Sequence, residues 1–233
     1  MKITVLHGQN HKGSTYKITN MLIEELKDDC TQIDEYHFLN NTGCVGCYQC
    51  FKQGEEKCPH FEQNKDAVRS LEEADLIIIE SSNYCMGMTG QLKVFMDHMA
   101  FRWITHRPHK KMFFKTGVAI STAAGAGSKK VVKDISQNMF YWGIPFIQKI
   151  NLNTWADTWE NISEKRMKKI KKKISVVARK INNKCGKIKP SIKLRMMFGL
   201  MKANQKNNKW SPADKQHWES QGWLEKTKPW SNT

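Results

Sequence analysis

The sequence has neither a long apolar run nor a recognisable export signal. No window approaches the ~20 apolar residues of a membrane-spanning helix. The first residues, MKITVLHG, form too short an apolar run for a secretory signal peptide, and no small-residue cleavage site follows them. We therefore expect a cytoplasmic protein in a reducing compartment, where stable disulfides are rare and clustered cysteines bind metal or do redox chemistry.

Acidic residues are scarce in the C-terminal part of the chain. Of the 233 residues, 38 are Lys or Arg and 22 are Asp or Glu, which gives a net charge of +16. Residues 1–150 carry 18 basic and 16 acidic side chains, whereas residues 151–233 carry 20 and 6. We predict a domain over residues 1–184 that is near-neutral up to residue 150, followed by a basic, tryptophan-rich and helical extension over residues 185–233.

Apolar runs alternate with amphipathic segments along the first 150 residues. The pattern predicts strands at 2–7, 32–38, 74–82, 112–122 and 144–153, separated by helices at 14–26, 62–73, 89–99 and 128–143. Strands that alternate with helices form a parallel sheet covered on both faces, and right-handed crossovers leave few topologies. We expect an α/β fold with a doubly wound, five-stranded parallel sheet in the order 2-1-3-4-5.

Three loops with ligand-type chemistry follow strands of this sheet. They read GQNHKGST, SSNYCMGMTG and STAAGAG. Ligands of such sheets bind beyond the carboxyl ends of the strands. The first loop places Gly8, Gly13, Ser14 and Thr15 at the start of a helix, where backbone N–H groups favour an anion. It lacks the P-loop and dinucleotide fingerprints, so a phosphate monoester fits best, with plain helix capping as the alternative.

The second loop resembles the flavin-binding segment of the NAD(P)H-dependent FMN reductases, within the flavodoxin-like superfamily. The matching residues are Ser81, Tyr84, Gly90, Gln91, Leu92, Lys93 and Asp97, while Ser82 and Asn83 replace the family's usual proline and apolar residue. The first loop stands where the family has its phosphate loop, with His11 or Lys12 in place of an often-seen arginine. STAAGAG resembles the loop along the isoalloxazine ring. The resemblance covers residues 1 to about 150 and implies a flavodoxin-like fold.

The resemblance implies one bound FMN and an enzymatic activity. NAD(P)H would reduce the flavin, and an unidentified small molecule or electron carrier would then be reduced in turn, in a chain that forms a homodimer or higher homo-oligomer. We name no catalytic side chain, since the flavin carries the chemistry. The expected FMN-binding residues are Gln9, Asn10, His11, Gly13, Ser14, Thr15, Ser82, Asn83, Tyr84, Cys85, Met86, Thr122, Ala123, Ala124 and Gly125. The alternatives are a flavodoxin-like electron carrier and a membrane-associated redox sensor, both without NAD(P)H oxidase activity.

Four cysteines lie within fifteen residues, in the segment CVGCYQCFKQGEEKC. Their spacing resembles that of the iron–sulfur flavoproteins of the same superfamily. That resemblance implies a [4Fe–4S] cluster held by Cys44, Cys47, Cys50 and Cys58. Free thiols and a four-thiolate zinc site stay open as alternatives.

Tryptophan is concentrated in the C-terminal part of the chain. Six of the eight tryptophans follow residue 150, and four of these lie in the basic extension. We expect residues 160–184 to form the last helix of the domain, and residues 190–230 to fold over a partner subunit or the flavin site. We do not expect nucleic-acid binding, because no known binding motif is present. A membrane surface is weighed for the basic amphipathic segment SIKLRMMFGLMKANQK, but it is not favoured.

Overall fold

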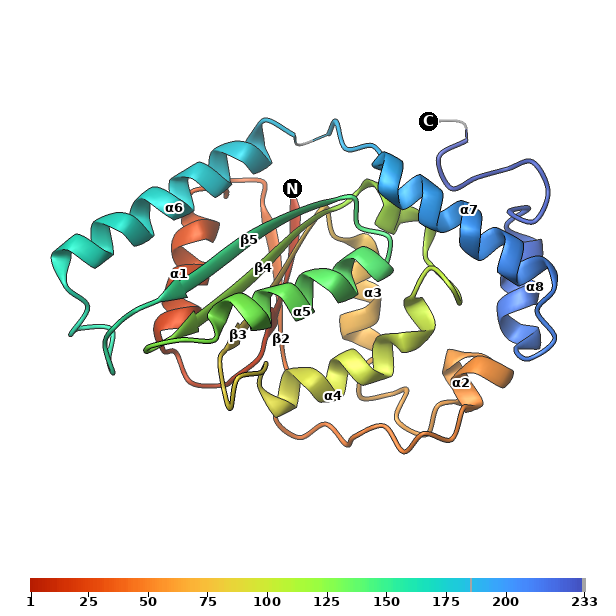
Figure 1. Cartoon of the computed structure of the whole chain (residues 1–233), viewed down its shortest axis with the longest axis horizontal. Helices are drawn as coiled ribbons and strands as arrows, with labels where there is room; N and C mark the ends of the chain where they lie inside the picture. The colour runs from red at the N-terminus through yellow and green to blue at the C-terminus, as the bar shows by residue number, and fades with distance from the viewer. Residues whose placement is uncertain (185, 232–233) are drawn as a thin grey trace.

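The computed structural model describes residues 1–184 and 186–231. A five-stranded parallel sheet in the order β2-β1-β3-β4-β5 lies at its centre (Figure 1). Its strands are β1 (Lys2–His7), β2 (Gln32–His37), β3 (Leu76–Ser82), β4 (Thr116–Ala123) and β5 (Phe146–Asn153). The predicted flavodoxin-like architecture and strand order are confirmed. All five carboxyl ends of the strands consequently lie at one edge of the sheet.

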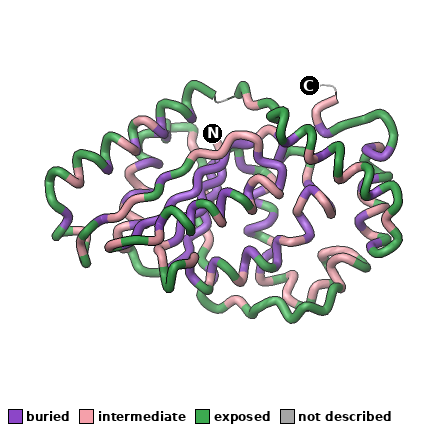
Figure 2. The backbone as a smooth tube through the Cα atoms, in the orientation of Figure 1, coloured by how far each residue is buried: buried purple, intermediate pink, exposed green. Residues whose placement is uncertain are grey.

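Helices cover both faces of the sheet, and the burial is concentrated in its central strands (Figure 2). Helices α1 (Ser14–Glu24) and α6 (Glu164–Asn182) pack on one face. Helices α3 (Lys65–Glu73), α4 (Gly90–His98) and α5 (Ser128–Tyr141) pack on the other. Successive side chains of a strand point to opposite faces, so Ile3 and Val5 contact the first layer and Leu6 the second. The helix expected near residues 160–184 is thus the last helix of the doubly wound layer.

Most predicted elements differ from the structure by a few residues at one end or at both. The helix expected from residue 62 begins at Lys65. The strand expected from Met112 begins only at Thr116, because a 3₁₀ helix, η3 (Lys110–Phe114), precedes it. In this turn, Met112 packs into the core between the sheet and α3–α5, while Phe113 packs into a separate cluster.

The C-terminal extension forms two helices that pack on the same chain. Helices α7 (Ile192–Lys206) and α8 (Pro212–Ser220) share a hydrophobic cluster with the segment between α4 and β4. Its buried members are Ile104, Phe113, Leu194, Phe198, Trp218, Trp223 and Leu224. The cluster lies near the amino end of β4, so the described tail residues do not cover the strand-end loops. Packing on a partner subunit stays a prediction. Within residues 1–184 and 186–231, no helix is long and apolar enough to cross a membrane.

Trp218 anchors this tail, because it is fully buried, stacks on Phe198 at 4.8 Å and donates its indole N–H to the carbonyl of His106 at 2.6 Å. We expect Trp218→Ala to lower the free energy of unfolding by about 3–5 kcal/mol, through the lost burial and the cavity left behind. Urea unfolding measures this change. The control Leu39→Ala, at a 55% exposed position, should change stability by no more than about 0.5 kcal/mol. Equal losses in the two variants would contradict a docked tail.

Candidate functional site

The loop after β1 leads into a helix whose first turn is open. No side chain among the described residues caps the N-terminus of α1, where Gly13 is the N-cap. The first N–H groups of a helix lack intrahelical partners, and the helix dipole makes this end positive. His11 and Lys12 are exposed beside it, and a Cβ at Gly13 would lie 2.7 Å from the His11 imidazole. This end of α1 is suited to a phosphate group.

Hydroxyl groups from three predicted loops meet at this helix end. The Oγ1 atom of Thr15 lies 2.9 Å from Oγ of Ser82 and 2.6 Å from Oγ1 of Thr122. Ser82 and Thr122 are neighbours in the register of β3 and β4. Thr15 is therefore positioned by the carboxyl ends of both strands, and the predicted phosphate loop is held against the two predicted ring loops.

The loop after β3 folds back in a tight turn. The backbones of Tyr84 and Gly87 exchange two N–H···O bonds of 2.9 Å. The two residues between them, Cys85 and Met86, have φ angles of 48° and 60°. Left-handed conformations of non-glycine residues cost about 1–2 kcal/mol each, and such strain concentrates at ligand sites. The turn exposes Tyr84 (50%) and Met86 (56%), which places apolar surface at the edge of the site.

Asn83 holds the third loop in place. Its backbone N–H donates to the carbonyl of Thr122 at 2.9 Å, and its Nδ2 donates to the carbonyl of Ala126 at 3.1 Å. Gly127, with φ of 100°, lies so close that a Cβ would come within 2.5 Å of the Asn83 amide. Asn83 Oδ1 is buried and has no hydrogen-bond partner within the described part of the chain. Buried acceptors are normally satisfied, so this atom is suited to an N–H donor of a bound ligand.

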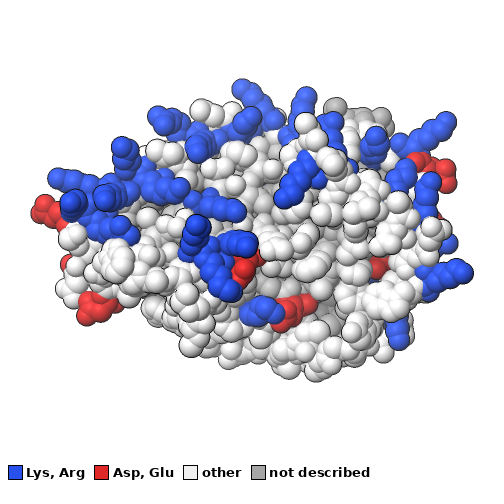
Figure 3. All heavy atoms as spheres, in the orientation of Figure 1, with Lys and Arg blue, Asp and Glu red and all other residues white. Residues whose placement is uncertain are grey.

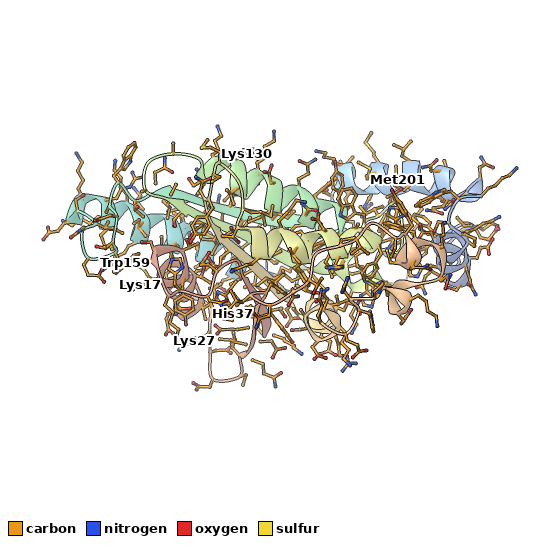
Figure 4. The ribbon with its side chains drawn as sticks, turned by 90° about the horizontal axis from the view of Figure 1, so that it is seen from below. Lys17, Lys27, His37, Lys130, Trp159 and Met201 are labelled. Atoms are coloured by element: carbon orange, nitrogen blue, oxygen red, sulfur yellow. The ribbon has the colours of Figure 1, made fainter. Side chains whose placement is uncertain are left out.

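A fourth strand end completes the cleft, which measures about 470 Å³. The segment after β5 contributes Trp159 and Glu160 to its lining. Lys17 lies over the Trp159 ring at 5.6 Å and pairs with Glu160 at 2.9 Å, and Figure 4 shows Lys17 and Trp159 side by side at one end of the molecule. The sequence analysis missed this segment, although β5 ends at the same edge of the sheet as the other strands.

Most of the predicted FMN-binding residues line this cleft. Those that do are His11, Gly13, Ser14, Ser82, Asn83, Tyr84, Thr122, Ala123 and Ala124. Thr15 binds the two hydroxyls from behind, while Asn10, Cys85, Met86 and Gly125 do not belong to the lining. The cationic side chains of Lys12 and Lys17 also line it, and both were missing from the predicted set.

A buried carboxylate ties the first two loops together. Glu80 and His7 are neighbours in the register of β3 and β1, and both are fully buried. The Glu80 carboxylate accepts from Nε2 of Gln9 at 2.8 Å through both oxygens and lies 2.9 Å from Nδ1 of His7. The Gln9 Oε1 in turn accepts from the backbone N–H of Ser82 at 3.1 Å. Gln9 therefore links the loops from below, and Glu80 is a supporting residue that the sequence analysis missed.

The four clustered cysteines lie between β2 and α3, in a segment that includes the short helix α2 (Gln49–Lys52) and the 3₁₀ helix η1 (Glu55–Lys57). Cys44 and Cys47 are exposed, Cys50 and Cys58 are half-buried, and all four are free thiols. Burial raises the pKa of Cys50 to about 11, and the other three thiols also raise this pKa while Arg107 opposes them. Cys44, Cys47 and Cys58 are thus close enough to Cys50 to act on it electrostatically.

The donor set has the chemistry that an iron–sulfur cluster needs. Cysteine thiolates are the usual ligands of a [4Fe–4S] cluster, and here four come from one loop. Within residues 1–184 and 186–231, no three or more His, Cys, Asp or Glu side chains are gathered closely enough to hold a metal ion. Ligation would therefore draw the four thiols closer together. It would also release the thiol proton of Cys50, which a pKa of about 11 retains at neutral pH.

The comparisons with known proteins agree with the fold. Residues 1–157 match the family model of the NADPH-dependent FMN reductases. The chain belongs to this family. It is 29% identical to an iron–sulfur flavoprotein from Archaeoglobus fulgidus over 148 residues, which are 62% of this chain and 64% of that protein. It is 29% identical to an iron–sulfur flavoprotein from Methanocaldococcus jannaschii over 92 residues, 40% and 46% of the two chains. The chain thus spans less than two thirds of the length of the curated relatives that it matches.

Solved structures resemble this chain in fold. The azoreductase AzrA aligns with a TM-score of 0.60 at 13% identity, over 77% of this chain and all of that one. The apo form of an NADH:FMN oxidoreductase aligns with a TM-score of 0.54 at 14% identity, over 83% and 93% of the two chains. At these identities the likeness shows the shared fold alone.

In this chain, an ionic network joins the extension to the cysteine segment. Asp214 of α8 is fully buried and pairs with Arg107 and with Nδ1 of His106, the latter at 2.7 Å. Arg107 also donates to the Cys50 carbonyl and pairs with Glu55 at 3.0 Å. Burial raises the pKa of Glu55, but the cations of Arg102 and Arg107 outweigh it and hold this pKa below the usual range. The segment that carries the thiols is therefore fixed from the C-terminal side.

We expect Asp214→Asn to destabilise the protein by about 3–5 kcal/mol, because it removes one of the two carboxylates that pair with the buried Arg107. Thiol alkylation at Cys50 should also become faster, since Arg107 then holds the Cys50 backbone less firmly. The measurements are urea unfolding and mass spectrometry of alkylated peptides. The control Glu219→Gln removes an exposed carboxylate of the same helix and should leave both quantities unchanged. An alkylation rate in Asp214→Asn equal to that of the control would contradict the coupling.

Proposed function

We propose that this chain is an NAD(P)H-dependent flavin oxidoreductase that binds one FMN in the cleft. The observation that carries the proposal is the meeting of Thr15, Ser82 and Thr122 at the open N-terminus of α1. It brings the three ligand-type loops to one place. The cleft volume of about 470 Å³ lies in the range of cofactor pockets.

Each part of the cleft has a role in this proposal. The free N–H groups at Gly13–Thr15, with His11 and Lys12, bind the phosphate monoester of FMN. The turn around Tyr84 and the loop held by Asn83 orient the flavin ring, and Asn83 Oδ1 accepts from a ring N–H. When bound, FMN supplies hydride chemistry with NAD(P)H and one-electron chemistry with other acceptors. The protein side chains bind and orient, and none is needed as an acid or a base.

We further propose that the cysteine segment holds a [4Fe–4S] cluster on Cys44, Cys47, Cys50 and Cys58. The thiolate donor set and the iron–sulfur flavoproteins among the relatives support this proposal. Helix α4 connects the two regions, because it begins beside the Tyr84–Gly87 turn and ends at His98, whose Nδ1 lies 3.9 Å from Cys58 Sγ. A helix of nine residues is roughly 14 Å long. The proposal includes a homodimer, a cytoplasmic location and an acceptor outside the chain.

Thr15→Val tests the flavin site. The variant keeps the shape of the side chain but loses the hydroxyl that joins Ser82 and Thr122, so FMN affinity should fall about tenfold, as expected for one or two lost hydrogen bonds of ~1 kcal/mol. The quenching of flavin fluorescence on binding measures the affinity. Thr19→Val is the matched control, because Thr19 lies one turn along in α1 and its buried hydroxyl has no partner among the described residues. If both variants bind FMN like the wild type, the phosphate does not lie at this end of α1.

Single Cys→Ser changes at the four ligand positions test the cluster. Each should abolish iron uptake on anaerobic reconstitution while FMN stays bound, because the flavin loops come from other strand ends. Iron and sulfide assays with absorbance spectra measure the outcome. Cys30→Ser, at an exposed free thiol outside the segment, should take up iron like the wild type. Uptake of zinc alone by the wild type, or of no metal, would rule out the cluster without affecting the flavin proposal.

A further inference from the structure

Helix α7 leaves a row of large apolar side chains in solvent. Ile192, Met196 and Leu200 are 79%, 71% and 63% exposed. They are four residues apart, so they lie along one face of the helix. The opposite face is also apolar, because Leu194 and Phe198 are buried in the cluster with Trp218. A solvated surface helix needs only one apolar face, so the packing of α7 on the chain does not require the exposed row.

The same part of the chain carries a single sign of charge. Residues 165–213 contain 17 Lys and Arg and no Asp or Glu. Figure 3 shows these cations along the edge of the molecule formed by α6, the connection to α7 and α7 itself. Lys189, Lys193 and Arg195 lie next to Ile192 and Met196 in sequence, and all three are exposed. Repulsion among like charges destabilises such a surface, unless a polyanion neutralises it.

We propose that this face binds the surface of an anionic lipid bilayer, with α7 lying in the interface. Ile192, Met196 and Leu200 would enter the boundary between headgroups and acyl chains, and the surrounding cations would contact the acidic headgroups. A helix with an apolar face and flanking Lys or Arg is the arrangement of interfacial membrane helices. The proposal goes beyond the oxidoreductase function and does not depend on it.

Charge and chemistry select lipid over other occupants of the row. A second copy of the chain would bring two strongly basic surfaces together, which like-charge repulsion opposes. A nucleic acid would match the cations, but it would leave the three aliphatic side chains in water, since bases stack on aromatic rings. A lipid surface matches the cations and the apolar row together.

The position of α7 is compatible with activity at the bilayer. In Figure 4, Met201 of α7 and Trp159 beside the cleft lie at opposite ends of the molecule. Binding through the exposed face of α7 would therefore leave the cleft open to water-soluble ligands. The inner face of α7 stays packed on the chain, so no part of the fold has to unfold for binding.

Vesicle sedimentation with the full chain tests the proposal. The wild type should sediment with vesicles that contain phosphatidylglycerol, lose this binding at high salt, and stay in the supernatant with pure phosphatidylcholine. Met196→Ser/Leu200→Ser should bind at least tenfold more weakly at unchanged thermal stability, because both side chains are exposed. The matched control Ile33→Ser/Leu39→Ser removes two exposed apolar side chains from another part of the surface and should bind like the wild type.

A second pair of variants separates local from overall charge. Lys187→Gln/Lys189→Gln should weaken vesicle binding severalfold, whereas Lys52→Gln/Lys57→Gln, with the same net charge, should have little effect. Failure of the wild type to bind anionic vesicles would overturn the proposal, as would equal binding by Met196→Ser/Leu200→Ser. A wild-type dimer that this double variant converts to a monomer, with no vesicle binding by either, would assign the row to a second copy instead.

Discussion

The cleft depends on the hydrogen bonds that the buried Glu80 side chain makes with Gln9 and His7. A carboxyl group without hydrogen-bond partners is costly to bury, and Glu80 is fully buried at the carboxyl end of the central strand β3. Its partners therefore have to be in place when the sheet forms. Gln9 comes from the loop after β1 and in turn binds the backbone of Ser82 in the loop after β3. Satisfying one buried carboxyl group thus fixes the spacing of the loops that we propose for the phosphate and the ring.

The buried Arg107 side chain holds separate segments together in the same way at the other end of the molecule. Arg107 lies beyond α4 and contacts the cysteine segment and the C-terminal extension together. The family model ends at residue 157, so the partner Asp214 belongs to the part of the chain that the family match does not include. The extension consequently contributes to the thiol-bearing segment through an ion pair, in addition to the apolar cluster around Trp218.

The sequence predicted the sheet and its ligand loops because both depend on local signals. The uninterrupted apolar run of β3 is typical of a strand buried on both faces, and parallel strands bring their carboxyl ends to one edge. The partners of the tail carry no such signal. Phe113 meets Phe198 across 85 residues of sequence, and no periodicity relates them. Glu80 was missed for a different reason: a charged residue at the end of an apolar strand normally indicates the surface, and only the three-dimensional register places His7 beside it.

Helix α4 links the cleft to the cysteine segment, and the exposed row on α7 lies away from the cleft. The cleft lies at the carboxyl edge of the sheet, and α4 runs from its ring loop to the half-buried thiol of Cys58. A short, packed helix cannot change its length, so the distance between these regions is set by the fold and not by loop motion. The exposed row on α7 lies on the outer side of the extension, away from the cleft. Because Arg107 and Trp218 hold the extension rigidly to the chain, a bilayer bound at α7 would orient the whole molecule and hold the cysteine segment at a constant height above the lipid.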